Sequence, residues 1–439
     1  MKRAILTVIA LLLIRPALPA VPLETVLDTT LDKNPTIQQA KLNLEQAAGQ
    51  RLVLRSVIWP SLRFNVPAGV QGGYRAGKNT IQAFGFARGS FTQPIFNAAI
   101  PASLRRGDID LLIAEQQFNV AVVEQLHSAR LAFYSGLYNR QLLSLTETQK
   151  RRLNENVSSQ EDRFRAGLAD RSAVAGATVQ AQDLDSQIEA ARRDYAAARL
   201  KLAEATGSNL GSTANFPEPE GELQFAPINV DVNSETASAL QRRTDVKLAQ
   251  LLVRAANDDE RIIAAGYYPV VNGVVTGDYI PVSGIHREGS TSRTQDFLSS
   301  EVREGATYTW QIIDGGRTAG AVNRQREAKE INEAELQKLQ SNVGRELSRI
   351  HNELESIEAR EKSLASAADA AEQDVSAIKQ NLGSGLSSEL EYRLAENSYL
   401  QTKTGMVDAA YLYNVTLAEW DRATGRYFQF SDDTAKNVH

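Results

Sequence analysis

The feature of this chain that most limits its fold is an internal repeat of roughly 200 residues. With an offset of 209 positions, the segment from Asn34 to Pro60 lies over the segment from Arg243 to Pro269. Further along, Ala205-Thr206-Gly207 lies over Ala423-Thr424-Gly425, so the offset grows only to 218. A unit of this length is far longer than the repeats of solenoid proteins. We therefore expect a duplicated half-domain whose two copies pack together.

Composition favours long helices packed side by side. Aromatic residues make up only 7% of the 439 residues, while Ala, Leu, Glu, Gln, Arg and Ser dominate. The formal net charge is -5 and the chain has no basic stripe, which argues against a nucleic-acid partner. The absence of Cys excludes disulfides, zinc sites built on Cys and a thiol nucleophile.

Residues 1–20 have the pattern of a secretory signal peptide. Lys2 and Arg3 form a basic start, Ala4 to Ile14 is an apolar run, and Ala17-Leu18-Pro19-Ala20 is a small-residue exit. Eleven apolar residues are too few to span a bilayer. We therefore expect cleavage near Ala20, and any membrane insertion of the exported chain would have to use strands.

Each half has the same predicted order of elements. In the first half, a helix from about Leu23 to Ile58 ends before Pro60, which cannot continue a helix. The segment from about Leu62 to Gln93 is predicted to form a β-hairpin, because it is rich in Phe, Val, Gly and Tyr. A second helix from about Ala98 to Arg165 then turns at Gly167 and returns to about Gly207.

Heptad spacing is clearest in the second half. Apolar residues recur every seven positions along two seams, one containing Val343, Ile350 and Ile357 and the other containing Leu347 and Leu354. Two seams sustained over about five heptads indicate a coiled coil. The second half is therefore predicted as a hairpin from about Val270 to Ile312, a coiled-coil helix that breaks at Gly383-Ser384-Gly385, and a returning helix that ends near Gly425.

The two hairpins supply four strands, which cannot close a sheet on themselves. Open strand edges beside long coiled coils would pair with other chains. Three copies would supply twelve strands, an acceptable number for a membrane barrel. In the last strand Ala306, Tyr308 and Trp310 share one face, and Glu304 interrupts it. We therefore expect a mainly helical protein whose strands are completed by further copies of the chain.

Local motifs recur in a fixed order in both halves. They are the Asn34-Pro35 start, the Trp59-Pro60 junction, the Gln93-Pro94-Ile95-Phe96 exit, the turns Phe164-Arg165-Ala166-Gly167-Leu168 and Asn381-Leu382-Gly383-Ser384-Gly385-Leu386, and the Ala-Thr-Gly ends. Together they resemble the outer-membrane efflux protein family of TolC-like channels. The resemblance covers nearly the whole mature chain.

The resemblance implies a homotrimer. Its twelve-stranded barrel would lie in outer-membrane lipid, and a coiled-coil α-barrel of twelve helical columns would continue it into the periplasm of a Gram-negative bacterium. The implied partners are a periplasmic adaptor and an inner-membrane transporter. The implied function is the passive outer-membrane channel of a tripartite efflux or type I secretion system.

The expected domain boundaries follow the repeat. The signal peptide at 1–20 precedes a first repeat at 21–225, with its hairpin at about 61–95 and its helix turn at about 166–170. The second repeat spans 226–425, with its hairpin at about 269–313 and its helix turn at about 383–387, and a tail follows at 426–439.

The resemblance also implies a constriction at the periplasmic end of the tunnel. Family members carry two acidic residues there, six and nine positions after the turn glycine. Counted from Gly385, these positions are Glu391 and Leu394, so this chain departs from a double acidic ring. Glu389 lies two residues before Glu391 and is a further candidate for the constriction.

The same resemblance makes the two helix turns candidates for contact with the adaptor. The residues concerned are Gly167 and Leu168 in the first turn and Gly385 and Leu386 in the second. A purely structural interpretation is that each glycine ends its helix in a left-handed conformation.

Nothing in the sequence points to catalysis. His127 and His351 lie inside helices without Asp, Glu or His partners at metal spacing, and His286 and His439 lie in a polar loop and in the tail. No glycine-rich loop resembles a phosphate cradle or a nucleophile elbow. We expect no enzyme activity, no metal and no cofactor. The alternative is a soluble periplasmic coiled-coil scaffold or adaptor, which would bury its hairpins in protein.

Overall fold

The computed structural model describes residues 20–75, 78–207, 217–281 and 298–427. The expected signal peptide, apart from Ala20, and the polar loop from Gly284 to Asp296 lie outside the described residues. The same holds for the C-terminal tail beyond Tyr427.

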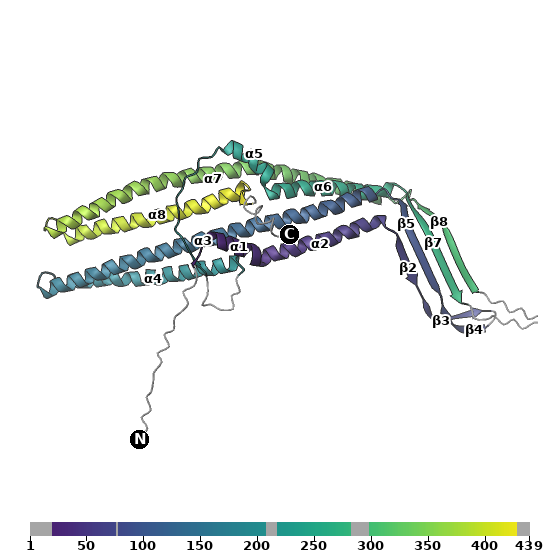
Figure 1. Cartoon of the computed structure of the whole chain (residues 1–439), viewed down its shortest axis with the longest axis horizontal. Coiled ribbons are helices and arrows are strands. Elements are labelled where there is room, and N and C mark those ends of the chain that lie inside the picture. The colour runs from purple at the N-terminus through teal and green to yellow at the C-terminus, as the bar shows by residue number, and fades with distance from the viewer. Residues whose placement is uncertain (1–19, 76–77, 208–216, 282–297, 428–439) are drawn as a thin grey trace, which may run out of the picture. The chain divides into compact units, whose positions relative to one another are not determined.

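The fold is mainly helical, and the same order of elements occurs twice, as the sequence predicted. In chain order the helices are α1 (Leu23–Lys33), α2 (Pro35–Arg55), α3 (Ile100–Arg165), α4 (Arg171–Ala205), α5 (Val232–Arg242), α6 (Thr244–Ala264), α7 (Arg317–Gly383) and α8 (Glu389–Ala423) (Figure 1). Short 3-10 turns at Ser56–Ile58 and Ala265–Tyr267 follow α2 and α6. In the described part of the chain, no helix has both the length and the apolar composition needed to cross a bilayer.

The chain divides into two compact units. Unit 1 comprises 1–40, 119–244 and 341–439, and unit 2 comprises 41–118 and 245–340. Unit 1 holds both helix turns, and unit 2 holds the main sheet.

The sheet of unit 2 has four antiparallel strands. They are β2 (Ser61–Asn65), β5 (Ala87–Phe96), β7 (Val270–Pro281) and β8 (Leu298–Thr309), in the spatial order β2-β5-β7-β8. A separate pair, β3 (Ala68–Arg75) and β4 (Lys78–Gly85), extends the first hairpin. Among the described residues, β2 and β8 each pair on one side only, so the sheet has two open edges.

The first hairpin is interrupted, although the sequence predicted a single hairpin from about Leu62 to Gln93. One arm breaks between Asn65 and Ala68, because Pro67 has no N–H to donate to a ladder. The other arm breaks at Phe86, whose N–H donates to the Pro67 carbonyl at 3.1 Å. The two arms therefore remain paired across the break, while the sheet divides into two pieces.

The first helix is also interrupted, so the prediction of one helix from about Leu23 to Ile58 is wrong. Pro35 disfavours helical backbone at Asn34, which is extended with ψ 124°. The Asn34 Oδ1 accepts hydrogen bonds from the N–H groups of Thr36 and Ile37 at 2.9 and 3.3 Å, which caps α2. The Asn34 Nδ2 donates to the Ala205 carbonyl at 2.8 Å, so this junction is fixed to the end of α4.

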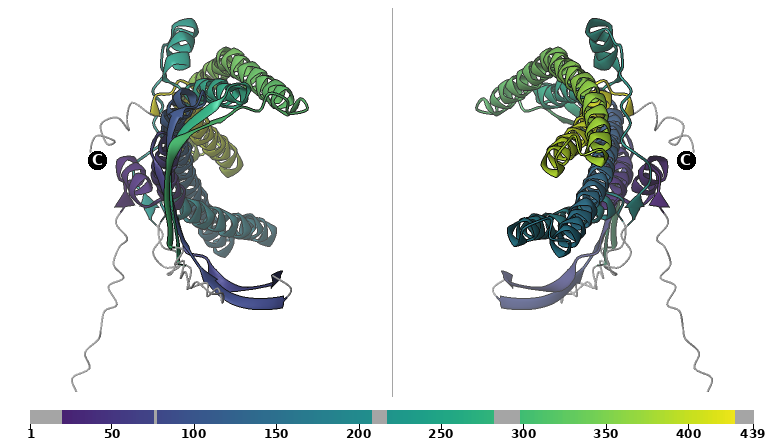
Figure 2. Two further views of the ribbon diagram at one scale, coloured as in Figure 1. Left: turned by 90° about the vertical axis from the view of Figure 1, so that its right-hand side faces the viewer. Right: turned by 90° about the vertical axis from the view of Figure 1, so that its left-hand side faces the viewer.

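The core of unit 1 forms where α3 meets its neighbours. Val26, Phe133, Leu137, Leu202 and Ala418 are buried there together and come from α1, α3, α4 and α8. Seen along the helices, the α3–α4 pair and the α7–α8 pair lie side by side (Figure 2).

The heptad seams of α7 face inward, as predicted. Val343, Leu347 and Ile350 are fully buried, and Leu354 and Ile357 are buried next along the helix. Closer to the turn, a Cβ added to Gly405 of α8 would lie 3.2 Å from Leu364. Glycine at this position therefore lets α7 and α8 approach closely.

A linker, residues 217–231, crosses the helices of unit 1 after α4. Its strand β6 (Glu218–Pro219) pairs in parallel with β1 (Ala20–Val21). Pro219 packs so closely on α3 that a Cβ at Gly136 would lie 2.8 Å from its Cγ. The linker also binds α8, because the Tyr413 hydroxyl donates to the Ala226 carbonyl at 2.7 Å. These contacts were not predicted from the sequence.

Candidate functional site at the helix turns

Both helix turns of unit 1 have the same backbone geometry. Gly167 and Gly385 have φ 73° and 75°, in the left-handed region where glycine is favoured. The next residue of each turn donates its N–H to the carbonyl five residues back, from Leu168 to Arg163 and from Leu386 to Asn381, both at 2.8 Å. These are Schellman caps. Figure 1 shows both turns at the same end of the helices of unit 1.

Each turn presents one leucine to solvent. The exposed fraction is 72% for Leu168 and 79% for Leu386, at equivalent positions of the repeat. The residue that precedes each leucine is the glycine whose left-handed backbone reverses the chain. The geometry therefore projects an apolar side chain from the tip of each helical hairpin.

Glu391 caps helix α8. The Glu391 Oε2 accepts hydrogen bonds from the N–H and the hydroxyl of Ser388 at 2.7 and 3.0 Å, and the Glu391 N–H donates to the Ser388 hydroxyl at 3.2 Å. This is a capping box. The Ser388 N–H, and after it the Ser388 hydroxyl, holds the pKa of Glu391 below its ordinary value. The carboxylate is therefore charged and held in a defined position at the start of the helix.

The other candidates around Glu391 differ in exposure. Leu390 and Leu394, on either side of it, are 67% and 61% exposed. Glu389 is half-buried, and its carboxylate lies 3.3 Å from the guanidinium of Arg393. Within a single chain, Glu391 is thus the acidic side chain of this end of α8 that faces solvent, between the exposed side chains of Leu390 and Leu394.

Two polar links join the α3–α4 hairpin to the α7–α8 hairpin near the turns. The Arg152 guanidinium of α3 lies 2.7 Å from the Glu396 carboxylate of α8. One turn of helix closer to the tips, Arg393 of α8 donates to the Asn156 side chain of α3. In the described structure the Nε of Arg393 and the Nδ2 of Asn156 are buried without a hydrogen-bond partner. The second link therefore leaves part of its hydrogen-bonding capacity unused.

Sequence reasoning missed these four residues. Arg152, Asn156, Arg393 and Glu396 are polar residues of long amphipathic helices, where polar residues usually face solvent. Their pairing depends on which faces of α3 and α8 meet. The helix order that settles this cannot be read from the spacing within either helix.

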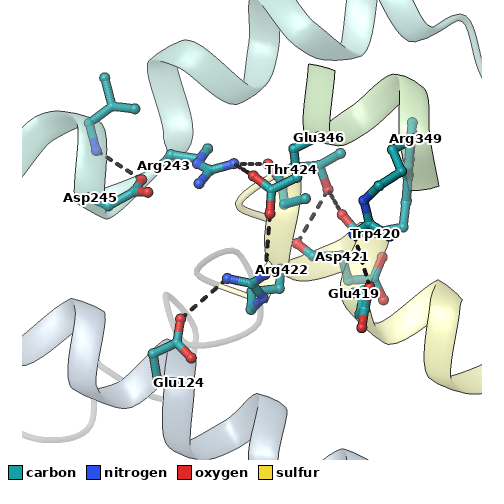
Figure 3. A network of polar contacts seen from close by, with 12 residues as sticks. Glu124, Arg243, Asp245, Glu346, Arg349, Glu419, Trp420, Asp421, Arg422 and Thr424 are labelled. Atoms are coloured by element: carbon teal, nitrogen blue, oxygen red, sulfur yellow. Dashed lines mark hydrogen bonds and ion pairs between the residues drawn. The ribbon is translucent and has the colours of Figure 1, made fainter. Parts of the chain in front are cut away.

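A second polar network lies at the far end of α8 (Figure 3). Arg243 is buried, and its guanidinium lies 2.6 Å from Glu346 of α7 and donates to the Ala423 carbonyl at 3.2 Å. Arg422 contacts the same Glu346 at 3.2 Å and Glu124 of α3 at 3.4 Å. Arg243 occupies the position that Asn34 occupies in the first repeat, and both side chains bind the last carbonyl of a returning helix. The network therefore anchors the base of the second hairpin.

The histidines of the helices have structural surroundings. His127 is buried against Tyr427, whose hydroxyl lies 3.4 Å from the histidine Nδ1. Burial, together with the positive charges of Arg422 and Arg130, lowers the pKa of His127 to about 4. His351 does have an acidic neighbour at helical spacing, contrary to the sequence analysis, since Glu355 lies 3.5 Å away. His286 and His439 lie outside the described residues.

The outer membrane efflux protein family model matches this chain twice, over residues 26–208 and 236–426. Outer membrane protein OprJ of Pseudomonas aeruginosa is 24% identical over 425 residues, which cover 92% of this chain and 84% of that protein. The CmeC outer membrane channel of Campylobacter jejuni has a similar fold, with a TM-score of 0.81 at 15% identity over 95% of this chain and 88% of that one. The outer membrane protein VceC of Vibrio cholerae gives a TM-score of 0.76 at 18% identity over 92% of this chain and 96% of that one.

Proposed function

Because the chain belongs to the outer membrane efflux protein family, we propose that three copies of it form the channel of a tripartite efflux system. The protein is an outer membrane efflux channel that extends into the periplasm, and it is not an enzyme. This sets aside the soluble periplasmic scaffold that the sequence left as an alternative.

The open edges of the sheet are the observation that supports the trimer proposal. Unpaired N–H and C=O groups along β2 and β8 are a template for another strand. An even number of antiparallel strands closes a membrane barrel, and three four-stranded sheets supply twelve. In this assembly β8 of one copy pairs with β2 of the next.

Engineered cysteines test this pairing, since the native chain has none. Single cysteines placed along β2, at Ser61 or Arg63, are combined with single cysteines along β8, at Arg303 or Thr307. At least one combination should give a covalent trimer under oxidation, while the corresponding single-cysteine variants should not. Monomers from every combination, in a preparation that conducts in planar bilayers, would contradict the arrangement.

The helix turns form the periplasmic end of this channel, and the links between the two hairpins hold it closed. Arg152–Glu396 and Arg393–Asn156 each join one hairpin to the other. Separation of the hairpins would break both contacts. In the closed trimer, three copies of Glu391 lie around the opening, with Glu389 as a second, partly neutralised carboxylate. Carboxylates in a narrow, water-filled opening attract cations.

A periplasmic adaptor binds the tips of the two hairpins in this proposal, and an inner-membrane transporter delivers the cargo. Leu168 and Leu386 are the contacts, because each projects from a tip and leaves most of its apolar surface in water. Gly167 and Gly385 supply the backbone conformation that points them outward. Leu386→Ser should reduce cross-linking of the trimer to the adaptor, with Leu112→Ser, an exposed leucine of unit 2, as the control. Equal cross-linking by both variants would contradict the contact.

A further inference from the structure

The two faces of the four-stranded sheet differ in chemistry. Side chains of a strand alternate between faces, and paired residues of neighbouring strands share one. The register of the sheet places Leu62, Phe91 and Val275 in one row of the first face. The rows beside it on the same face include Phe64, Val302 and Tyr308. This face is mainly apolar, and Glu304 is its only charged residue, beside the polar residues Gln93 and Ser300.

The opposite face collects the charges. It holds five of the six charged residues of β2, β5, β7 and β8, and we call them the charge belt: Arg63, Arg88, Asp278, Glu301 and Arg303. Two adjacent rows contain all five. One row runs from Arg63 through Ser90 and Thr276 to Arg303, and the next runs from Asn65 through Arg88 and Asp278 to Glu301.

Four of the five residues neutralise one another. Asp278 lies between two arginines, 2.6 Å from Arg88 and 3.6 Å from Arg303, and only 12% of its side chain is exposed. Arg303 also lies 3.0 Å from Glu301. Arg63 is different, since it is exposed and has no hydrogen bond or ion pair within the described part of the chain. The belt thus carries one more positive than negative charge.

We propose that the charge belt is a second selectivity site of the channel and attracts anions. Arg63 is the residue of the belt whose guanidinium is available to bind them. The inference rests on the proposed trimer. In that assembly the apolar face meets lipid, so the belt lines the water-filled interior, and Arg63 sits on the edge strand at each junction between copies. A guanidinium binds carboxylate and phosphate groups in a bidentate manner, so the ligand class is small carboxylates and phosphates.

Reversal potentials across a potassium chloride gradient in planar bilayers test the belt. Arg63→Gln should lower the anion-to-cation permeability ratio by about twofold, because the three charges act on the permeating ion through water that contains screening salt. Arg63→Lys, which keeps the charge, should leave the ratio unchanged. Glu301→Gln should raise the ratio by about the same factor.

Glu304→Gln is the matched control. It removes the same charge from the same strand, three residues away on the opposite face, and should leave the permeability ratio unchanged. The proposal is overturned if Arg63→Gln and Glu301→Gln leave the reversal potential where it was, or if Glu301→Gln and Glu304→Gln shift it equally. A purified, unmodified protein that forms no conducting trimer would contradict the proposed function instead, so the two failures are distinguishable.

Discussion

Replacing Glu396 by Gln should open the periplasmic end of the channel. The Glu396 side chain joins the two hairpins through Arg152, at 2.7 Å. Gln keeps the size and one acceptor oxygen of Glu but removes the charge. The hydrogen bond from the Tyr392 hydroxyl, at 3.5 Å, can persist, so the change acts mainly on the link between α3 and α8.

The size of the effect follows from the exposure of the pair. Loss of a charge-assisted hydrogen bond costs about 1.5–3 kcal/mol when the groups are buried. Glu396 is 15% and Arg152 is 37% exposed, so solvent screening reduces this to about 1–2 kcal/mol. A trimer has three such contacts, and the closed state would lose about 3–6 kcal/mol in total. At about 1.4 kcal/mol per factor of ten, the ratio of open to closed channels should rise at least about a hundredfold.

Single-channel recording of the purified trimer measures this ratio. Asp185→Asn provides the matched control, because Asp185 of α4 binds Lys150 of α3 at 2.8 Å, within one hairpin. Lys150 lies two residues from Arg152 on α3. That contact need not break when the hairpins separate, so the control should open no more often than the unmodified channel. Arg152→Met should open the channel to a similar degree, and the double variant should add little, since both changes remove one contact.

The outcome that refutes this reasoning is specific. If Glu396→Gln channels open no more often than Asp185→Asn channels, the contact between α3 and α8 does not hold the closed state. Additive effects of Arg152→Met and Glu396→Gln would show that the two residues act separately, even if each variant opens.

Three further predictions concern the cap, the linker and a buried histidine. Glu391→Gln keeps the capping box but removes the charge, so it should lower the cation preference of the channel in planar bilayers. Glu355→Gln, far along the coiled coil, should leave the cation preference unchanged. Equal cation preference in both variants would place Glu391 outside the opening. Gly136→Ala should destabilise unit 1 by about 1–2 kcal/mol, because the overlap with Pro219 exceeds the gain in helix propensity, and hydrogen exchange of the linker should rise. Gly176→Ala, where an added Cβ has no atom within 4 Å, should stabilise the protein by about 0.5–1 kcal/mol. If Gly136→Ala and Gly176→Ala change the free energy of unfolding in the same direction, the packing argument is contradicted. His127 has a folded pKa of about 4 against 6.5 when unfolded, so the unfolded chain binds more protons between these values and stability falls as pH drops through that window. His127→Phe should remove about 2 kcal/mol of this loss in thermal denaturation between pH 7 and pH 4, and an unchanged pH profile would show that His127 is not the group that titrates.

The fold was largely accessible from sequence because its signals are local and repeated. The spacing of Val343, Leu347 and Ile350 predicted which face of α7 is buried, and all three are fully buried. The two turn glycines were identified from their place between helical segments, and both adopt positive φ. Duplication strengthened each signal, since every element could be compared with its counterpart.

The errors in the sequence analysis arose at single residues whose effect depends on distant partners. Asn34-Pro35 was read as the start of a motif within a helix, yet Asn34 caps α2 and binds Ala205, 171 residues away. Pro67 was passed over inside the expected hairpin, although it divides the sheet. The side-chain links near the turns were missed for the same reason.

The sequence by itself determined the duplication, the order of helices and strands, the family and the candidate carboxylates near Gly385. Periodicity sets the order of helices and strands, because it records which face of each element must leave water, while the candidate carboxylates follow from the family resemblance. Only the tertiary structure decided that Glu391 caps its helix and that Arg152 meets Glu396. It likewise decided that five charges from four strands share one face. Such contacts depend on the rotation and register of elements far apart in the chain, and these are fixed by packing between elements rather than by any pattern within one.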